Sequence, residues 1–138
     1  MTLPRIPNIP LNTGHPIPQL GLGTYKLSRE DTPRIVEFAL SKGCRHIDTA
    51  QMYGNESEVG QAIAASGIPR EDVFLTTKLD NSNHEPAAAR ESFAASLKLL
   101  GTDYVDLYYA HFDDPNTPLE ESVAVFEELR SAGKTRYV

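Results

Sequence analysis

The chain has 138 residues, of which 40% are apolar and 23% charged, and its net charge is −6. These values are typical of one compact globular domain with its own core. The acidic balance argues against nucleic acid or an anionic membrane as the main partner, because both bind clustered positive charge. The single cysteine, Cys44, excludes an internal disulfide. With no apolar leader segment and no run long enough to span a bilayer, the sequence predicts a cytoplasmic protein.

The first eighteen residues predict a β-hairpin, because the turn signal Asn12-Thr13-Gly14 separates two short extended arms. After it, strand-like runs alternate with helical segments that are each followed by a glycine. The predicted strands cover residues 19–24, 44–49, 72–78, 104–111 and 135–138. The predicted helices cover residues 31–42, 56–66, 86–100 and 117–132. This alternation favours βαβ units around a parallel sheet.

Local capping signals support the predicted helix starts. Ser28 and Asp31 have capping-box spacing, and so do Thr117 and Glu120. Asn55 precedes the second helix as a candidate N-cap, and a proline at position 86 opens the third.

Two parallel architectures compete for this pattern. A doubly wound fold requires a glycine-rich phosphate turn after its first strand, and Gly21 and Gly23 lack a third glycine at the right offset. The alternative is a (β/α)8 TIM barrel of about 250 residues. Four βα units and the start of a fifth strand make about half of such a barrel. We therefore expect an α/β fold in which residues 1–138 form one domain, with a hairpin over 1–18 and βα units over 19–138.

Three titratable residues stand at successive predicted strand ends: Asp48, Lys78 and His111. Catalytic groups of βα barrels sit at these carboxyl ends. Because strand side chains alternate between faces, each residue should continue a row that faces the barrel interior. The expected rows are Cys44, His46 and Asp48; Phe74, Thr76 and Lys78; and Leu107, Tyr109 and His111. The loop that carries Tyr53 could fold over the same end.

Such a set can protonate a carbonyl oxygen. A free tyrosine has a pKa of about 10 and is a weak acid, but a neighbouring ammonium stabilises the phenolate. Lys78 would supply that charge to Tyr53, and Asp48 would hold Lys78 in place. A neutral His111 could donate a hydrogen bond to the same carbonyl oxygen. The set contains no evident nucleophile or reductant, so a hydride would have to come from a cofactor.

The motifs GLGTY, RHIDTAQMYGNE, LTTK, YVDLYYAH and GKTRYV resemble the N-terminal half of an aldo-keto reductase, nearest to bacterial members of the diketogluconate-reductase type. The resemblance implies carbonyl reduction with NADPH, which this family binds across the barrel mouth. It implies a catalytic tetrad of Asp48, Tyr53, Lys78 and His111, with Tyr53 as the general acid. It also implies that the hairpin plugs the barrel floor. The implied cofactor contacts are Thr24, Tyr25 and Asp48. The implied substrate contacts are Tyr25, Met52, Asp80, His111 and Phe112.

The sequence departs from the family pattern at two places in the substrate pocket. Relatives usually carry tryptophan where this chain has Asp80 and Phe112, so the substrate is expected to differ while the chemistry is kept. The family also takes its adenosine phosphate site and its nicotinamide-stacking aromatic from strands five to eight. A missing C-terminal half or a second copy would then cover the open strand edges. A truncated or non-catalytic barrel scaffold is the alternative function.

A metal centre is not expected. His111, Asp113 and Asp114 lie close in sequence, but no further histidine or cysteine stands at ligand spacing. A solvated loop explains this acidic stretch better than a metal site does.

Overall fold

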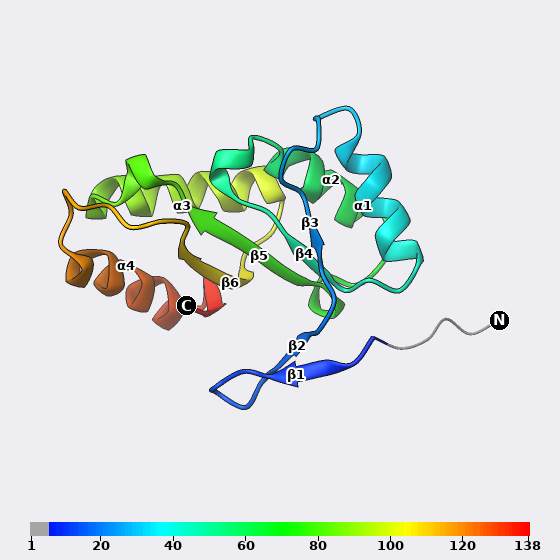
Figure 1. The fold of residues 1–138 in the computed structure, drawn as a ribbon, viewed down its shortest axis with the longest axis horizontal. Helices are drawn as coiled ribbons and strands as arrows, with labels where there is room; N and C mark the ends of the chain where they lie inside the picture. Colours follow the sequence, from blue (N-terminus) through cyan, green and yellow to red (C-terminus); the bar gives the residue numbers. More distant parts are fainter. Residues whose placement is uncertain (1–5) are drawn as a thin grey trace.

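The computed structural model describes residues 6–138, so the first five residues of the predicted hairpin segment lie outside the described part. A curved parallel sheet is lined by helices, and a small hairpin extends from the end at which the strands begin (Figure 1). The strands of the sheet are β3 (Leu22–Gly23), β4 (His46–Asp48), β5 (Phe74–Leu79), β6 (Val105–Ala110) and β7 (Thr135–Tyr137).

The strand order is β3-β4-β5-β6-β7, and every neighbouring pair is parallel. A doubly wound sheet reverses its order at a switch point, whereas barrel strands follow one another in sequence. The uninterrupted order therefore confirms the βα-unit plan and excludes the doubly wound alternative.

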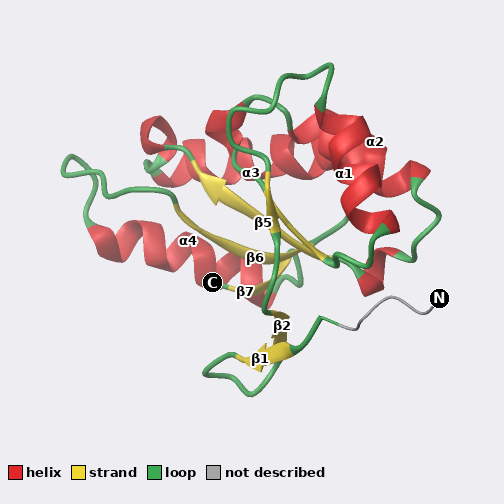
Figure 2. Ribbon diagram, turned by 45° about the vertical axis from the view of Figure 1, so that its right-hand side comes forward, coloured by secondary structure: helices red, strands yellow, loops and turns green. Residues whose placement is uncertain are grey.

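The four helices lie along the outer side of the sheet, and each follows its strand as in successive βα units (Figure 2). They are α1 (Thr32–Ser41), α2 (Glu56–Ala65), α3 (Pro86–Leu100) and α4 (Leu119–Ser131). Three single-turn helices occupy the loops: η1 (Gln51–Tyr53), η2 (Arg70–Asp72) and η3 (Asn81–Asn83). All four predicted helices are present: α3 has the predicted ends, and no end of the other three differs from the prediction by more than two residues.

Two of the predicted caps are wrong, and long-range or upstream contacts explain why. Asn55 stands at the N-cap of α2 but makes no side-chain cap, because its amide bonds the β3–α1 loop instead. Thr117 donates its hydroxyl to Asp114 at 2.7 Å, and α4 begins only after Pro118. By contrast, the Ser28 hydroxyl and Asp31 do pair, at 2.9 Å and 3.0 Å, just before α1.

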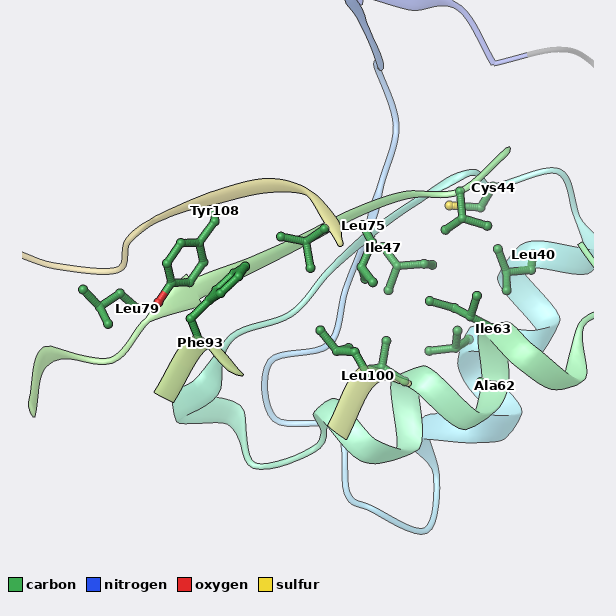
Figure 3. Close-up of a cluster of buried hydrophobic side chains, with 14 of the residues drawn as sticks. Leu40, Cys44, Ile47, Ala62, Ile63, Leu75, Leu79, Phe93, Leu100 and Tyr108 are labelled. Carbon is green, nitrogen blue, oxygen red and sulfur yellow. The ribbon is translucent and has the colours of Figure 1, made fainter. Parts of the chain in front are cut away.

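The core lies between the sheet and the helices and is built from aliphatic side chains with Phe93 and Tyr108 at one end (Figure 3). Phe93 and Tyr108 pack with ring centroids 4.4 Å apart. Cys44 belongs to this cluster, beside Leu40, so its predicted place in the interior row is wrong. The physical reason is that β4 begins only at His46, and strand alternation does not extend back to Cys44.

The hairpin consists of β1 (Asn8–Pro10) and β2 (Pro16–Pro18), which pair antiparallel. Gly14 closes its turn at φ +83°, a left-handed conformation that favours glycine. The predicted turn at residues 12–14 is thus confirmed, and the hairpin lies outside the five-stranded sheet. Among the described helices, none combines the length and apolarity that a membrane crossing demands.

Candidate active site

The carboxyl ends of three neighbouring strands carry the titratable residues singled out above. Asp48 is the last residue of β4, Lys78 is the penultimate residue of β5, and His111 follows the end of β6. Pairing sets Asp48 beside Thr76 and Lys78 beside Tyr109. Parallel pairing therefore brings these side chains to one end of the sheet, which we call the rim.

Lys78 is the centre of the rim and is only 5% exposed. Its Nζ donates to Asp48 Oδ1 at 2.5 Å, to the Thr49 carbonyl at 2.8 Å and to the Tyr53 hydroxyl at 3.4 Å. An ammonium has three donors, and each of them has a partner here. Because a buried cation needs a counter-charge and hydrogen bonds, the contacts to Asp48 and Thr49 fix Lys78 beneath the phenol.

Tyr53 is the last residue of η1, the short turn that follows β4. Its ring lies between those of Tyr25 and His111, with centroid separations of 5.1 Å and 5.5 Å. Gly54 follows in a left-handed conformation at φ +69°, which sends the chain directly into α2. The phenol is thus held by two aromatic neighbours and by the Lys78 ammonium.

His111 is poised as a neutral hydrogen-bonding group. Burial and then the positive charge of Lys78 lower its pKa, against weaker opposite effects of Asp48 and Asp80. Its Nδ1 is buried and has no hydrogen-bond partner among the described residues. An unpaired buried N–H costs more than an unpaired nitrogen lone pair, so the proton belongs on Nε2. A neutral imidazole with its proton on Nε2 keeps one N–H donor.

Tyr109 lies on the other side of Lys78, with Nζ 5.7 Å from its ring centroid. Burial raises the pKa of Tyr109, and the Lys78 charge only partly opposes this effect. The Tyr109 phenol therefore remains protonated, although Lys78 also acts on it as a hydrogen-bond donor. The Tyr53 hydroxyl lies 3.4 Å from the ammonium, and the Tyr53 ring packs against His111.

A buried polar network joins the loops on either side of β4. The Thr24 hydroxyl lies 2.9 Å from the Thr49 hydroxyl, and each of these hydroxyls lies 3.2 Å from Asn55 Oδ1. Asn55 Nδ2 donates to the backbone carbonyls of Thr24 and Leu27 at 2.9 Å and 3.3 Å. Thr24 has no exposed surface. The packing thus gives no support to a direct cofactor contact by Thr24, and the residue serves to hold the loop that presents Tyr25.

The predicted substrate contacts occupy the exposed side of the rim. Tyr25, Met52 and Phe112 are 62%, 45% and 56% exposed, and Phe112 stacks on His111 with centroids 4.7 Å apart. Asp80 is half-buried, and one of its oxygens accepts from the Ser82 amide and hydroxyl at 2.9 Å and 2.8 Å. Asp80 thus shapes the β5–α3 loop with one oxygen and leaves the other available.

Residues 6–138 include no group of three or more His, Cys, Asp or Glu side chains suited to hold a metal ion. The donor set of the rim is an ammonium, a phenol, an imidazole and a partly exposed carboxylate. The Tyr53 phenol and the His111 imidazole offer O–H and N–H donors and Asp48 offers acceptor capacity, which fits the ribose and carbonyl oxygens of a nicotinamide cofactor and its substrate. Such a set can deliver a proton to an oxygen and hold that oxygen in place.

Two residues that support the rim were missed at the level of sequence. Gln51 connects η1 with the β5–α3 loop, and Asn55 connects the β3–α1 and β4–α2 loops. Both lie within a motif that was already singled out, but apart from Thr49, six residues before Asn55, their partners are 28 to 57 residues away in the chain. No local spacing signal identifies contacts of this kind.

Comparison with known proteins places the chain in a family. The Aldo/keto reductase family matches residues 19–138. An aldo-keto reductase of Mycolicibacterium smegmatis is 49% identical over 133 residues, which are 96% of this chain and 48% of that protein. The chain thus spans about half the length of this curated relative.

Solved structures give the same result. An aldo-keto reductase of Bombyx mori in complex with NADP is 37% identical with a TM-score of 0.87, over 96% of this chain and 49% of that one. A protein provisionally named 2,5-diketo-D-gluconic acid reductase B is 49% identical with a TM-score of 0.85, over 87% of this chain and 43% of that one. The parallel βα units superpose on about half of a barrel of this family. The chain therefore belongs to the aldo/keto reductase family and corresponds to the N-terminal portion of its (β/α)8 barrel.

Proposed function

We propose that this chain carries the proton-donating apparatus of an NADPH-dependent reductase that converts an aldehyde or ketone to an alcohol. The observation that supports the proposal best is the Lys78 ammonium, which is bound by Asp48 and lies 3.4 Å from the Tyr53 hydroxyl. A buried lysine aimed at a phenol is an arrangement that favours loss of the phenolic proton.

In this mechanism Tyr53 is the general acid. Reduced nicotinamide, when bound, supplies the hydride that adds to the carbonyl carbon. The carbonyl oxygen takes up the proton of the Tyr53 hydroxyl, and the resulting phenolate is stabilised by Lys78. Asp48 and the Thr49 carbonyl hold the ammonium during this transfer. His111 donates its Nε2–H to the same oxygen and orients the substrate.

We assign the cofactor contacts of this portion to Asp48 and Tyr25. The side chain of Asp48 is 30% exposed although one oxygen binds Lys78, which leaves acceptor capacity for a ribose hydroxyl. The NADP found with the Bombyx mori relative supports NADPH as the cofactor. We assign five residues to contacts with the carbonyl substrate: Tyr25, Met52, Asp80, His111 and Phe112. A cytoplasmic location stays a prediction.

A complete site requires groups that residues 6–138 do not supply. Within the described part, β3 and β7 each pair with one neighbour only. We propose that a C-terminal half or a second copy covers these edges, and that the hairpin of residues 8–18 closes the barrel floor. Its position at the strand-starting end supports this assignment (Figure 1).

The test joins residues 1–138 to the C-terminal half of the Mycolicibacterium smegmatis relative, so that a whole barrel is present. We expect this hybrid to oxidise NADPH in the presence of an aldehyde. Tyr53→Phe should lower kcat by about 10²–10⁴-fold, because a general acid contributes that much, while the dissociation constant of NADPH stays unchanged. Tyr104→Phe, at the opposite end of the sheet, is the matched control.

Two outcomes would contradict the proposal. Full turnover by the Tyr53→Phe variant would remove Tyr53 as the acid. A folded hybrid that binds NADPH and reduces no carbonyl offered would favour the non-catalytic scaffold.

A further inference from the structure

Gln51 makes four side-chain hydrogen bonds that lead away from the turn it belongs to. Its Oε1 accepts from the Asp80 backbone N–H at 2.8 Å and from Asn83 Nδ2 at 3.3 Å. Its Nε2 donates to the hydroxyls of Ser92 and Tyr108, both at 3.3 Å. A primary amide has two donors and two acceptor sites, so this side chain is fully used.

The hydrogen-bond partners of the Gln51 side chain decide which way its amide oxygen and nitrogen point. The Asp80 backbone N–H can only donate, so the oxygen of Gln51 must face the β5–α3 loop. The nitrogen then faces two hydroxyls, one on α3 and one on β6. Gln51 therefore joins three successive parts of the fold to η1: the loop after β5, the first half of α3 and the middle of β6.

Two partners of Gln51 belong to the packed helix and strand of the fold. Tyr108 has no exposed surface and packs against Phe93 and Phe126. Burial raises the pKa of Tyr108 far above its ordinary value, so its hydroxyl stays protonated. Ser92 sits on α3 and donates to the Ala89 carbonyl at 3.2 Å. The Gln51 nitrogen is thus anchored on the packed helix and strand, while its oxygen binds the β5–α3 loop.

Gln51 and Tyr53 are the first and last residues of the same three-residue turn. The turn is closed by backbone bonds from Tyr53 N to the Ala50 carbonyl at 3.1 Å and from Gly54 N to the Gln51 carbonyl at 3.3 Å. A displacement of Gln51 must therefore move Tyr53. Apart from the packing of its ring on Tyr25 and His111, Tyr53 has only a 3.4 Å contact between its hydroxyl and Lys78, which is too long to set the position of the phenol by itself.

We propose that Gln51 is the positioning residue for Tyr53: its amide ties η1 to Asp80 and Tyr108 and so sets the phenol against Lys78. The proposal rests on the proposed function only for its catalytic consequence. The same bond to the Asp80 amide also sets the loop that carries the Asp80 side chain. One amide thus couples the general acid to one wall of the substrate site.

The test uses NMR on the 138-residue chain labelled with 13C on tyrosine rings, with the Tyr53 signal assigned from Tyr53→Phe. Gln51→Met has similar length and removes all four hydrogen bonds. We expect it to displace the Tyr53 ring resonance and to speed hydrogen exchange of the Asp80 amide by about tenfold or more. Gln61→Met, at an exposed glutamine of α2 with one bond to Ser57, is the matched control and should change neither.

Rescue separates positioning from general destabilisation. Gln51→Glu keeps two acceptor oxygens, and the Ser92 and Tyr108 hydroxyls can turn to donate to them. We expect Gln51→Glu at neutral pH to return the Tyr53 resonance and the Asp80 exchange rate toward wild type. In the hybrid barrel, Gln51→Met should lower kcat about tenfold with the NADPH dissociation constant unchanged.

The inference fails if Gln51→Met leaves the Tyr53 resonance in place, whether or not the hybrid is active. It also fails if the Glu variant behaves like the Met variant. If Gln51→Met does not fold, Tyr108→Phe and Ser92→Ala each remove one partner and should displace the Tyr53 resonance less, in the same direction. No displacement in either variant would overturn the proposal. An inactive hybrid with the expected NMR result would reject only the proposed function.

Discussion

The two ends of the parallel sheet each carry a carboxylate bound to a cation, but they differ in what is left unsatisfied. At the strand-starting end, Asp106 accepts from Arg70 at 3.0 Å and from the Leu75 amide at 2.9 Å, and Arg136 lies at 3.4 Å. Tyr104 is stacked between the two guanidiniums, at 4.3 Å and 4.6 Å from its ring centroid. Both oxygens of Asp106 are used, and its side chain is 4% exposed.

The rim also holds an ion pair between a carboxylate and a cation, but several hydrogen-bonding groups around it are not fully used. The Asp48 side chain is 30% exposed, the Tyr53 hydroxyl has one long contact, and Nδ1 of His111 has no partner in the described part of the chain. A cluster whose hydrogen-bonding groups all have partners, here called saturated, holds elements together. A cluster with unpaired groups can use them to bind a ligand and to react. The difference teaches that buried charge alone does not identify a reactive site.

The largest loss of stability should come from a substitution in the saturated cluster around Asp106. Asp106→Ala leaves Arg70 and the Leu75 amide without their carboxylate, and removal of one partner from a buried ion pair costs about 3–5 kcal/mol. Urea denaturation should show this loss in the free energy of unfolding, with the exposed Asp113→Ala as control. A loss as small as that of the control would show that the cluster does not hold this end together.

The next effect should appear at the rim, in turnover more than in stability. Lys78→Met removes the charge that stabilises the phenolate, so kcat of the hybrid barrel should fall by about 10²-fold or more. The partly exposed Asp48 can be solvated, so we expect the free energy of unfolding to fall by only about 1–2 kcal/mol. Stopped-flow turnover and urea denaturation give both numbers. If Lys78→Met lowered the free energy of unfolding more than Asp106→Ala does, the rim and not the Asp106 cluster would be the stabilising end of the sheet.

The smallest effect concerns Glu56, a buried carboxyl that forms no ion pair among residues 6–138 and accepts from Thr77 at 2.6 Å and Ser96 at 3.2 Å. Burial raises its pKa above 4.5, and the two hydrogen bonds oppose this less strongly. The folded state therefore retains this proton to higher pH than the unfolded chain. The resulting stability is fully present below about pH 4.5 and is lost as pH rises through the folded pKa.

Glu56→Gln removes that dependence. Its free energy of unfolding, relative to wild type, should increase between about pH 4 and about pH 7 in denaturant titrations. The exposed Glu71→Gln supplies the baseline for the same pH range. An unchanged difference between Glu56→Gln and wild type across this range would mean that Glu56 ionises alike in the folded and unfolded chain.

Local signals in the sequence were sufficient for most of the fold. Proline at position 86 and glycine at position 101 bound α3 as predicted, because each acts on its own backbone. The first strand was predicted over 19–24, yet β3 is only Leu22–Gly23. Pairing with β4 alone sets its length, and such pairing cannot be read from one segment.

For the site, strand alternation and strand-end position indicated which side chains share the rim, because parallel strands share one direction. The supports of the rim were not predictable in this way. Asn55 was interpreted as an N-cap because that role is local, whereas its partners, the Thr24 and Leu27 carbonyls, are 31 and 28 residues away. The catalytic roles themselves stay predictions until the variants are measured.

The hydrogen bonds of Asn55 to the preceding loop have a consequence for which substitutions that loop can accept. Its amide recognises two backbone carbonyls, and a backbone carbonyl is the same whichever residue bears it. Tyr25 and Lys26 lie between those carbonyls and are exposed, so exchanging them does not remove these two bonds, but Tyr25 packs on Tyr53 with centroids 5.1 Å apart and Lys26 has a left-handed φ of +61°. The two loops beside β4 can therefore stay joined while the exposed surface next to the rim changes.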